Sequence, residues 1–343
     1  MTMLRDSKHL YLDHDFVETG DGWIFGVVSN THPPGRILAY LKYIPGDGVW
    51  TRDGIAYKRV LATYSMREVG QMVESVRKSR PEYVYMDPST GEEFVYVPVE
   101  RVVKHYRCEE GLARILERPV NRVEAVCAEL VNQLSSRSGL SYGFFGVSGS
   151  LLLRLFNPAA DIDLVVYGGE NFRKVVEASY RLQTEKTLAE NQAILVKNYM
   201  AKYPITQEEA EELAKRCRTR GIFHGTYYSL HAVRTLRENK RSYGEVTSRY
   251  IGVEKTILRI TDASESVFTP AVYGVEDLGG KNVEQLVCYD TTFAGLFNEG
   301  EVVEALGKLE KTVDHVENRV YLSLVIGTIR TADIEYVKPL RSV

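Results

Sequence analysis

The chain has 343 residues, of which 44% are hydrophobic and 26% charged, and its formal net charge at pH 7 is -3. These values are ordinary for a soluble globular protein of two or three domains, and the net charge alone argues neither for nor against nucleic-acid binding. No segment approaches the ~18 consecutive apolar residues of a membrane span, and residues 1–15 lack the apolar segment of a signal peptide. We therefore expect a cytoplasmic protein without a membrane partner.

Residues 1–110 are expected to form an N-terminal β-rich α+β domain. Segments rich in Val, Ile, Tyr and Phe alternate with turn clusters such as THPPG, PGDG and RDG. The turn HPPGR contains His32, a candidate ligand or base, although a turn histidine is more often only exposed or hydrogen-bonded. One helix is predicted over 66–78, and residues 98–117 are predicted to be helical and to lead into the next domain.

Residues 111–250 are expected to form a central α/β domain. Apolar residues at three-four spacing predict a helix that ends near SSRSG, followed by a strand YGFFGV, a Gly-Ser turn, a short helix and a strand ADIDLVVYG. Asn171 is the candidate N-cap of the next helix. Thr206 and Glu209 form a predicted capping box for a helix that stops at Gly221, and TYYSLHAVR is predicted to be a strand.

Residues 251–343 return to a β pattern. Segments such as KTILRITDA, FTPAVYGVE and VYLSLVIGTI alternate with turns that contain Gly. The rhythm of Gly and Val residues in EGEVVEALGKLE is typical of a small barrel, so we expect a C-terminal β-barrel-like domain.

The four cysteines are too far apart to form a recognisable motif. None of them belongs to a CxxC pair, so zinc-binding and redox motifs are unsupported and reduced, buried thiols are expected. The positions are Cys108, Cys127, Cys217 and Cys288.

Basic residues gather in one segment of the chain. Nine Lys or Arg residues lie between 215 and 249, against Glu238 and Glu245, whereas 262–317 is acidic. The basic segment could attract phosphates, and a solvated helix face with salt bridges is the alternative. The candidate contacts to a nucleic-acid or phosphorylated acceptor are Lys215, Arg216, Arg218 and Arg220.

Two acids interrupt an apolar run in the segment GVSGSLLLRLFNPAADIDLVV, residues 146–166. Side chains on a strand alternate between faces, so Asp161 and Asp163 project together, ~6–7 Å apart. Two carboxylates this close repel each other unless a cation lies between them or water is near. Hard divalent cations such as Mg²⁺ take carboxylate and phosphate oxygens together.

The Gly-Ser turn upstream could supply the phosphate part of such a site. Gly149 allows a close approach of backbone to ligand, and Ser150 opens a helix whose free N–H groups and dipole favour an anion. Arg154, one turn along that helix, is a candidate to neutralise a phosphate or to pair with an acid.

The sequence VSGS, ten residues, DIDLVV resembles the active-site signature of the polymerase-β-like nucleotidyltransferase superfamily. The whole chain resembles archaeal predicted nucleotidyltransferases. The resemblance implies that Gly149 and Ser150 grip the triphosphate of an NTP and that Asp161 and Asp163 hold Mg²⁺ (or Mn²⁺). It also implies an α+β fold in which a nucleotidyltransferase-like α/β domain is flanked by the two β-rich domains.

The chain departs from that superfamily at one position. A third carboxylate from a later strand usually completes the metal site, but the matching strand, GTYYSLHAVR, carries Ser229 and His231 instead. Asp262 is the nearest strand-end alternative, although it is expected to open the C-terminal domain. His231 is a candidate catalytic residue, as a metal ligand or base, and a packed strand histidine is the alternative.

The first hypothesis is therefore a Mg²⁺-dependent nucleotidyltransferase that moves a nucleoside monophosphate from an NTP to an acceptor hydroxyl. The acceptor would be a nucleic acid such as RNA, a protein or a small molecule. The alternative is a catalytically weak or inactive protein of this fold that binds nucleotide or RNA, which the missing third acid favours. The sequence carries no signal for an oligomeric state.

Overall fold

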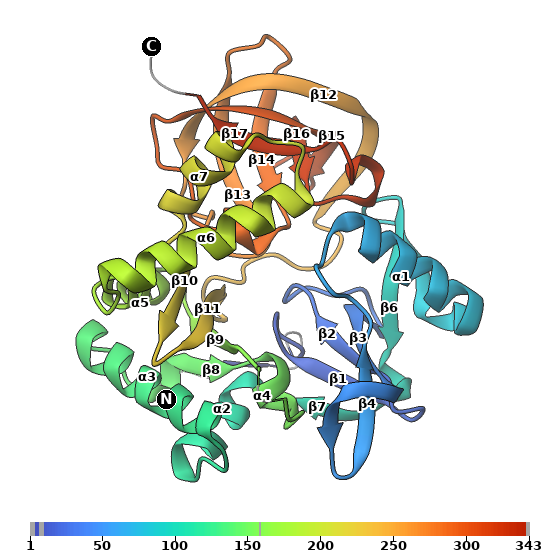
Figure 1. Cartoon of the computed structure of the whole chain (residues 1–343). Helices are drawn as coiled ribbons and strands as arrows, with labels where there is room; N and C mark the ends of the chain where they lie inside the picture. The colour runs from blue at the N-terminus through green and yellow to red at the C-terminus, as the bar shows by residue number, and fades with distance from the viewer. Residues whose placement is uncertain (1–3, 7–9, 158, 341–343) are drawn as a thin grey trace. The chain divides into compact units, whose positions relative to one another are not determined.

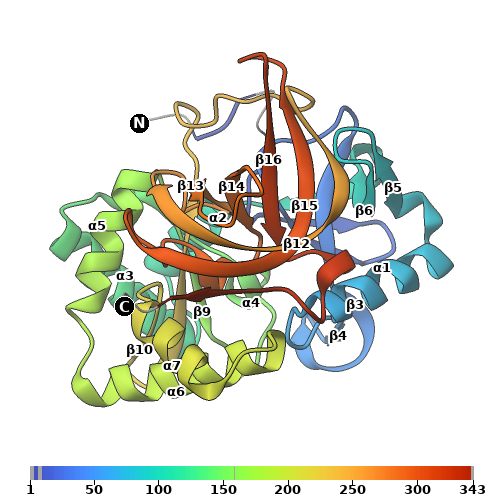
Figure 2. The same cartoon turned by 90° about the horizontal axis from the view of Figure 1, so that it is seen from above.

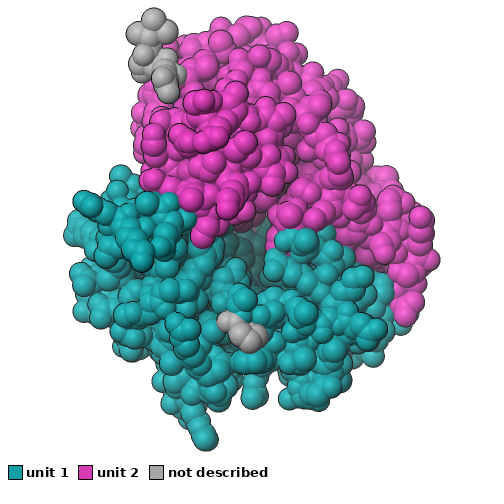
Figure 3. Space-filling model, viewed as in Figure 1, with its two compact units in different colours: residues 1–62, 95–191, 218–240 teal, residues 63–94, 192–217, 241–343 magenta. Residues whose placement is uncertain are grey.

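The computed structural model describes residues 4–6, 10–157 and 159–340. The chain folds into two compact units, which Figure 3 shows in different colours. Each unit is assembled from three separate stretches of the sequence. Unit 1 contains residues 1–62, 95–191 and 218–240, and unit 2 contains residues 63–94, 192–217 and 241–343. Three consecutive domains with boundaries near 110 and 250 stay a prediction.

The first sheet is built largely by the N-terminal residues. Its strands are β1 (Phe16–Thr19), β2 (Ile24–Val27), β3 (Arg36–Arg52), β4 (Ile55–Arg59), β5 (Val84–Asp87), β6 (Glu92–Pro98) and β7 (Val102–Tyr106). The strand order is β5-β6-β3-β2-β1-β7, with β4 paired to β3. Asp53 and Gly54 join β3 to β4 with positive φ angles of 50° and 81°, as a two-residue hairpin turn requires.

The second sheet lies wholly in unit 1 and contains the acid pair of the sequence motif. Its order is β10-β11-β9-β8, and its strands are β8 (Phe145–Val147), β9 (Ile162–Tyr167), β10 (Arg220–Phe223) and β11 (Thr226–Val233). Strands β9 and β11 are parallel, and the other pairs are antiparallel. Leu164, Val165 and Val166 of β9 are all fully buried, so both faces of this central strand are covered.

Helices of unit 1 cover this sheet. They are α2 (Cys108–Glu117), α3 (Arg122–Ser138), α4 (Gly149–Leu153) and α5 (Gly169–Tyr180), and α6 (Glu185–Lys202) continues from unit 1 into unit 2 (Figure 1). Helix α3 packs against α5, and α2 packs against β8. Short 3-10 turns lie at Pro81–Tyr83, Val99–Arg101, Tyr142–Phe144, Thr291–Phe293 and Ile329–Thr331.

Unit 2 is built around a half-barrel sheet. Its order is β12-β13-β14-β16-β15-β17, and β12 also pairs with β15, so the sheet curls back on itself (Figure 2). The strands are β12 (Val246–Asp262), β13 (Ala271–Asp277), β14 (Val283–Cys288), β15 (Val302–Asp314), β16 (Arg319–Ile326) and β17 (Tyr336–Pro339). Helices α1 (Met66–Ser79) and α7 (Gln207–Arg216) also belong to this unit.

The core of unit 2 is rich in aromatic side chains. Tyr273, Phe293 and Phe297 lie in the curled sheet and its connecting loop, and Leu195 and Tyr199 of α6 pack with them. Aromatic rings bury a large apolar area each, so this cluster stabilises the unit by the hydrophobic effect.

Most predicted elements are confirmed, including the mixed α+β class, the helix near 66–78 and the strand over TYYSLHAVR. The capping box of Thr206 and Glu209 is also confirmed, but α7 ends at Arg216, and Gly221 lies in β10. The four cysteines are free and buried as expected. None of the described helices is long and apolar enough to cross a membrane.

Two predicted helix boundaries are wrong. Residues 102–106 of the predicted 98–117 helix form strand β7, which pairs with β1, and the helix begins only at Cys108. Helix α5 begins at Gly169 with Gly168 as its N-cap, whereas the Asn171 amide donates to the Tyr167 carbonyl.

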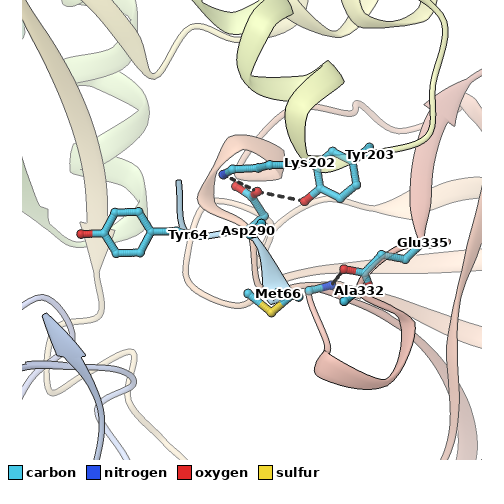
Figure 4. A pocket seen from close by; sticks show the side chains of 9 residues that line it. Tyr64, Met66, Lys202, Tyr203, Asp290, Ala332 and Glu335 are labelled. Carbon is cyan, nitrogen blue, oxygen red and sulfur yellow. Dashed lines mark hydrogen bonds and ion pairs between the residues drawn. The ribbon is translucent and has the colours of Figure 1, made fainter. Parts of the chain in front are cut away.

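A small cavity in unit 2 contains a buried cluster of charged groups (Figure 4). Lys202 and the Tyr203 hydroxyl both donate to Asp290, at 2.8 and 2.9 Å. The Lys202 charge and hydrogen bond, with the hydrogen bonds from Thr292, hold the pKa of Asp290 below its ordinary value despite burial. The cavity offers about 10 Å³ to the centres of water molecules, which is room for roughly one water. This cluster is therefore part of the packed structure.

Glu335 in the same cavity should make stability depend on pH. It is 1% exposed, and burial raises its pKa to about 7, although Gly327, Thr328 and Thr331 donate hydrogen bonds to it. Its carboxyl ionises in the unfolded chain before it ionises in the folded one, so the folded state loses stability as pH rises from about 4.5 to 7. The loss is roughly 3 kcal/mol.

Urea denaturation of wild type and Glu335→Gln from pH 4 to 8 checks this prediction. As pH rises, the unfolding free energy of wild type should fall relative to that of Glu335→Gln. The exposed Glu299→Gln is the control and should show no such shift. A pH-independent difference between wild type and Glu335→Gln would contradict the assigned pKa.

Candidate functional site

Asp161 and Asp163 lie where β9 begins, and their charges act on each other. Repulsion from Asp163 is the largest cause of the raised pKa of Asp161, and desolvation adds to it. The two carboxylates therefore lie close enough to interact, which agrees with the predicted alternation of side chains. Asp161 is exposed, whereas the Asp163 side chain is 24% exposed. Solvent therefore reaches the Asp161 side chain more freely than the Asp163 side chain.

The Gly-Ser turn is hydrogen-bonded directly to β9. The Ser148 N–H donates to the Asp163 carbonyl at 2.8 Å, and Gly149 has a φ of +63°, a value that favours glycine. A Cβ atom at Gly149 would overlap the Oδ2 atom of Asp163 and lie 3.3 Å from its Cγ. Only a glycine therefore lets the turn approach the acid this closely.

Ser150 presents a buried hydroxyl at the same turn. The residue is 5% exposed, and its Oγ has no hydrogen-bond partner among the described residues. An unsatisfied buried polar atom is costly, by about 1–3 kcal/mol. A ligand oxygen would satisfy it, but the turn encloses the hydroxyl, so such a ligand reaches it only if the turn or a neighbouring side chain moves.

Ser229 occupies the position next to Asp163 on the parallel strand β11. The two residues are direct partners in the β9–β11 register, and the Ser229 hydroxyl donates to Asp163 Oδ1 at 2.6 Å. Its single proton is used in that bond, so the His231 Nε2, 2.8 Å from Ser229 Oγ, must carry its own proton and donate it. No acid takes this place in the described part of β11.

The surroundings shift the pKa of Asp163 and that of His231 in a direction that keeps the acid charged and the imidazole neutral. Burial alone would raise the pKa of Asp163, but His231, the Lys42 charge and the Ser229 hydrogen bond outweigh it and lower the pKa. Burial, with the nearby His14, lowers the pKa of His231 to about 3, so this imidazole is neutral. Its Nε2 lies 3.8 Å from Asp163 Oδ1.

His14 is a part of the site that the sequence analysis missed. Its ring lies 4.2 Å from the ring of His231 between centroids, and its carbonyl accepts a hydrogen bond from the Ser148 hydroxyl at 2.7 Å. Its Nε2 has no hydrogen-bond partner among the described residues and lies 3.6 Å from Asp13 Oδ2. The motif DHD at 13–15 was the available signal, and only the fold shows that it meets β11.

Lys42 of β3 was also missed. Its charge lowers the pKa of both Asp161 and Asp163, and the charge of Arg59 in β4 acts on Asp161 as well. Charges of the first sheet thus act on the acid pair. Backbone hydrogen bonds also join this sheet to the segment that leads to Asp161, since Thr51 of β3 forms an isolated bridge with Phe156.

The other sequence candidates lie elsewhere. Arg154 is exposed at the C-cap of α4, and Asp262 ends β12 in unit 2, where it accepts the Ser264 N–H. His32 bonds the Tyr11 carbonyl and the Leu38 N–H.

The basic segment is partly neutralised by acidic neighbours. Arg216 pairs with Glu212 and Glu301, and Arg218 lies 3.7 Å from Glu177, so these two cations fit the alternative of a salt-bridged face. Their charges are therefore partly compensated before any phosphate binds.

The donor set fits a hard divalent cation in part. Carboxylate oxygens from Asp161 and Asp163 are the ligands that Mg²⁺ and Mn²⁺ prefer, and the Gly149 backbone lies directly beside the Asp163 carboxylate. In the described ranges, however, no group of three or more His, Cys, Asp and Glu side chains is arranged to hold a metal. A bound ion would therefore need further oxygens from a ligand or water.

Gly149→Ala tests the contact between the turn and Asp163. Gly139 at the end of α3 is the matched control, because its φ of +70° is similar but no atom lies within 4 Å of a Cβ there. Gly139→Ala should cost about 1 kcal/mol of stability, from backbone strain alone. Gly149→Ala should cost about 1–3 kcal/mol more, because the methyl group displaces the carboxylate.

Urea denaturation of both variants measures the difference. Equal losses of unfolding free energy in Gly149→Ala and Gly139→Ala would show that a methyl group at position 149 does not displace the Asp163 carboxylate.

Comparison with known proteins places the chain in a family. No family model and no solved structure matches it. The uncharacterized protein MJ1086 of Methanocaldococcus jannaschii is 31% identical over 341 residues, an alignment that covers 94% of this chain and 97% of the relative. The chain therefore belongs to the same protein family as MJ1086.

Proposed function

We propose that this protein is a divalent-cation-dependent nucleotidyltransferase, which moves a nucleoside monophosphate from an NTP to an acceptor hydroxyl. The observation that carries the proposal is the contact between the Gly149 backbone and the Asp163 carboxylate. It brings the Gly-Ser turn next to a pair of acids suited to Mg²⁺ or Mn²⁺. The resemblance of the VSGS and DIDLVV segments to the polymerase-β-like signature supports the same activity.

Each residue has a role in the proposed site. Asp161 and Asp163 would hold the ion, which when bound stabilises the charge on the entering and leaving oxygens. Gly149 and Ser150 would contact the triphosphate, and the unsatisfied Ser150 hydroxyl would donate to one of its oxygens once the turn or a neighbouring side chain moves. Ser229 holds the Asp163 carboxylate in a fixed orientation through its 2.6 Å hydrogen bond.

The proposed reaction is an in-line displacement at the α-phosphorus. The acceptor oxygen forms a bond to that phosphorus while the bond to the bridging oxygen of the β-phosphate breaks, and pyrophosphate leaves with the bonding electrons. His231 is neutral, but a pKa of about 3 makes it a weak base, so we assign the hydroxyl proton to solvent water and give His231 the role of orienting Ser229 through Nε2. Arg154 stays a candidate phosphate contact, since its guanidinium is exposed.

Binding without transfer is the second candidate function. Ser229 stands in register with Asp163, where the resemblance implies a third carboxylate, so the ion would be held by fewer protein oxygens. A protein of this kind would bind nucleotide or RNA and not turn it over.

Calorimetry with Mg²⁺ and each NTP, together with transfer of an α-labelled NTP to RNA, protein and small acceptors, tests both candidates. Asp161→Asn and Asp163→Asn should weaken Mg²⁺–NTP binding by at least the roughly 10- to 100-fold typical of changes at metal sites. Transfer activity should fall with them. Asp47→Asn, at an exposed position in the β3–β4 hairpin, is the control and should behave like wild type.

The outcomes separate the candidates. Transfer that depends on both acids supports the enzyme, and binding without transfer on every acceptor supports the second candidate. Unchanged NTP binding in both Asn variants would overturn the enzyme, and absence of both NTP and RNA binding by wild type would overturn both candidates.

A further inference from the structure

Arg5 joins two carboxylates in unit 1. Its side chain is 10% exposed, and that of Asp15 is fully buried. The guanidinium donates two hydrogen bonds to Asp15, at 2.5 and 3.0 Å, and two to Glu109, at 2.7 and 2.8 Å. Its remaining N–H donates to the Leu10 carbonyl at 2.7 Å. All five N–H groups of the guanidinium are therefore used, a set of donors that only an arginine provides.

Both acids are held in their charged form. Burial would raise the pKa of Asp15, but hydrogen bonds from His105 and Arg5 outweigh it and lower this pKa. Burial acts on Glu109 in the same sense, and the hydrogen bonds and charge of Arg5 again lower the pKa. Loss of the cation that they share would be strongly destabilising for the charged acids, so the protein around them would rearrange.

The Asp15 carboxylate shapes the segment 12–15. It accepts the backbone N–H groups of Leu12 and Cys108, at 3.1 and 3.2 Å. The Asp15 N–H donates back to the Leu12 carbonyl, so the segment forms a closed turn. His14 lies inside this turn with a φ of +68°, a strained value that persists only when the surrounding structure holds it. The backbone of His14 is therefore fixed only while Asp15 is held.

The turn at 12–15 in its own right supports the Gly-Ser turn of the candidate site. The His14 carbonyl accepts the Ser148 hydroxyl at 2.7 Å, and the Ser148 N–H donates to the Asp163 carbonyl at 2.8 Å. Glu109 reaches the strand of the site as well, because the hydroxyl of Tyr167, the last residue of β9, donates to it at 2.8 Å. Both acids of the cluster are thus joined by hydrogen bonds to the elements that position the candidate site.

We propose that Arg5 is a positioning residue of the candidate site, which holds the turn at 12–15 and through it keeps the Gly-Ser turn against Asp163. The use of that site to bind Mg²⁺ and NTP rests on the proposed function, whereas the positioning itself does not. The motif at 146–166 contributes only Ser148 to the connection through His14. Arg5 contacts no reacting group in this account.

Amide hydrogen exchange at Ser148, compared with that at Leu230, tests the proposal. The Leu230 N–H donates to the Thr219 carbonyl in the same unit, so it reports the stability of unit 1 away from the Gly-Ser turn. Arg5→Ala should speed exchange at Ser148 about tenfold or more, because opening of the turn no longer breaks the Arg5 pairs, and should affect Leu230 less. Arg5→Lys keeps the charge but loses the planar fork of donors, so its effect should be smaller than that of Arg5→Ala.

Arg181→Ala is the matched control. Arg181 also lies in unit 1, but it pairs with Glu177 at the surface, and its side chain is 70% exposed. Exchange at both amides should stay as in wild type, because a surface ion pair contributes little to stability.

A combination of Arg5→Lys with Ser148→Ala tests the route through His14, and it also carries the test if Arg5→Ala does not fold. Ser148→Ala removes the hydroxyl that bonds the His14 carbonyl. After correction for intrinsic exchange rates, Arg5→Lys should change exchange at position 148 less in this background, because the two changes act on one connection and are not additive.

The outcomes separate this inference from the proposed function. Equal acceleration at Ser148 and Leu230, or none at Ser148, would overturn the positioning role, and so would an effect of Arg5→Lys that is the same with and without the Ser148 hydroxyl. Arg5→Lys should also weaken Mg²⁺–NTP binding about three- to tenfold. Absence of NTP binding by wild type would count against the proposed function, and the exchange comparison would still decide the role of Arg5.

Discussion

The contact between the Gly149 backbone and the Asp163 carboxylate is the constraint on which the candidate site depends. The Ser148 N–H bonds the Asp163 carbonyl, the positive φ of Gly149 turns the chain, and the absence of a side chain leaves room for Oδ2. One acid is thereby held at the turn, while Asp161 remains open to solvent. An enclosed and an exposed carboxylate side by side can receive a ligand from the open side.

Strand β11 and the first sheet complete this arrangement with groups that carry no negative charge. Ser229 and the neutral His231 fix the orientation of Asp163, the His14 ring lies against that of His231, and the Lys42 charge lowers the pKa of Asp163.

The local chemistry of the site could be predicted from sequence, but its surroundings could not. Strand alternation is sufficient to place Asp161 and Asp163 on one side, and a Gly-Ser pair between a strand and a helix indicates a tight turn. His14 and Lys42 reach the site only through sheet pairing and long-range packing, which no local pattern specifies. The same reason explains strand β7, which pairs with β1 although its sequence looks like the start of a helix.

The central claim is that one divalent ion and one polyphosphate bind together at the acid pair and the Gly-Ser turn. Anomalous diffraction from crystals soaked with Mn²⁺ and a non-hydrolysable NTP tests it most directly. The account predicts a manganese peak between the carboxylates of Asp161 and Asp163, with phosphate density at Gly149 and Ser150. A nucleotide bound elsewhere, or a manganese peak that touches neither acid, would contradict it.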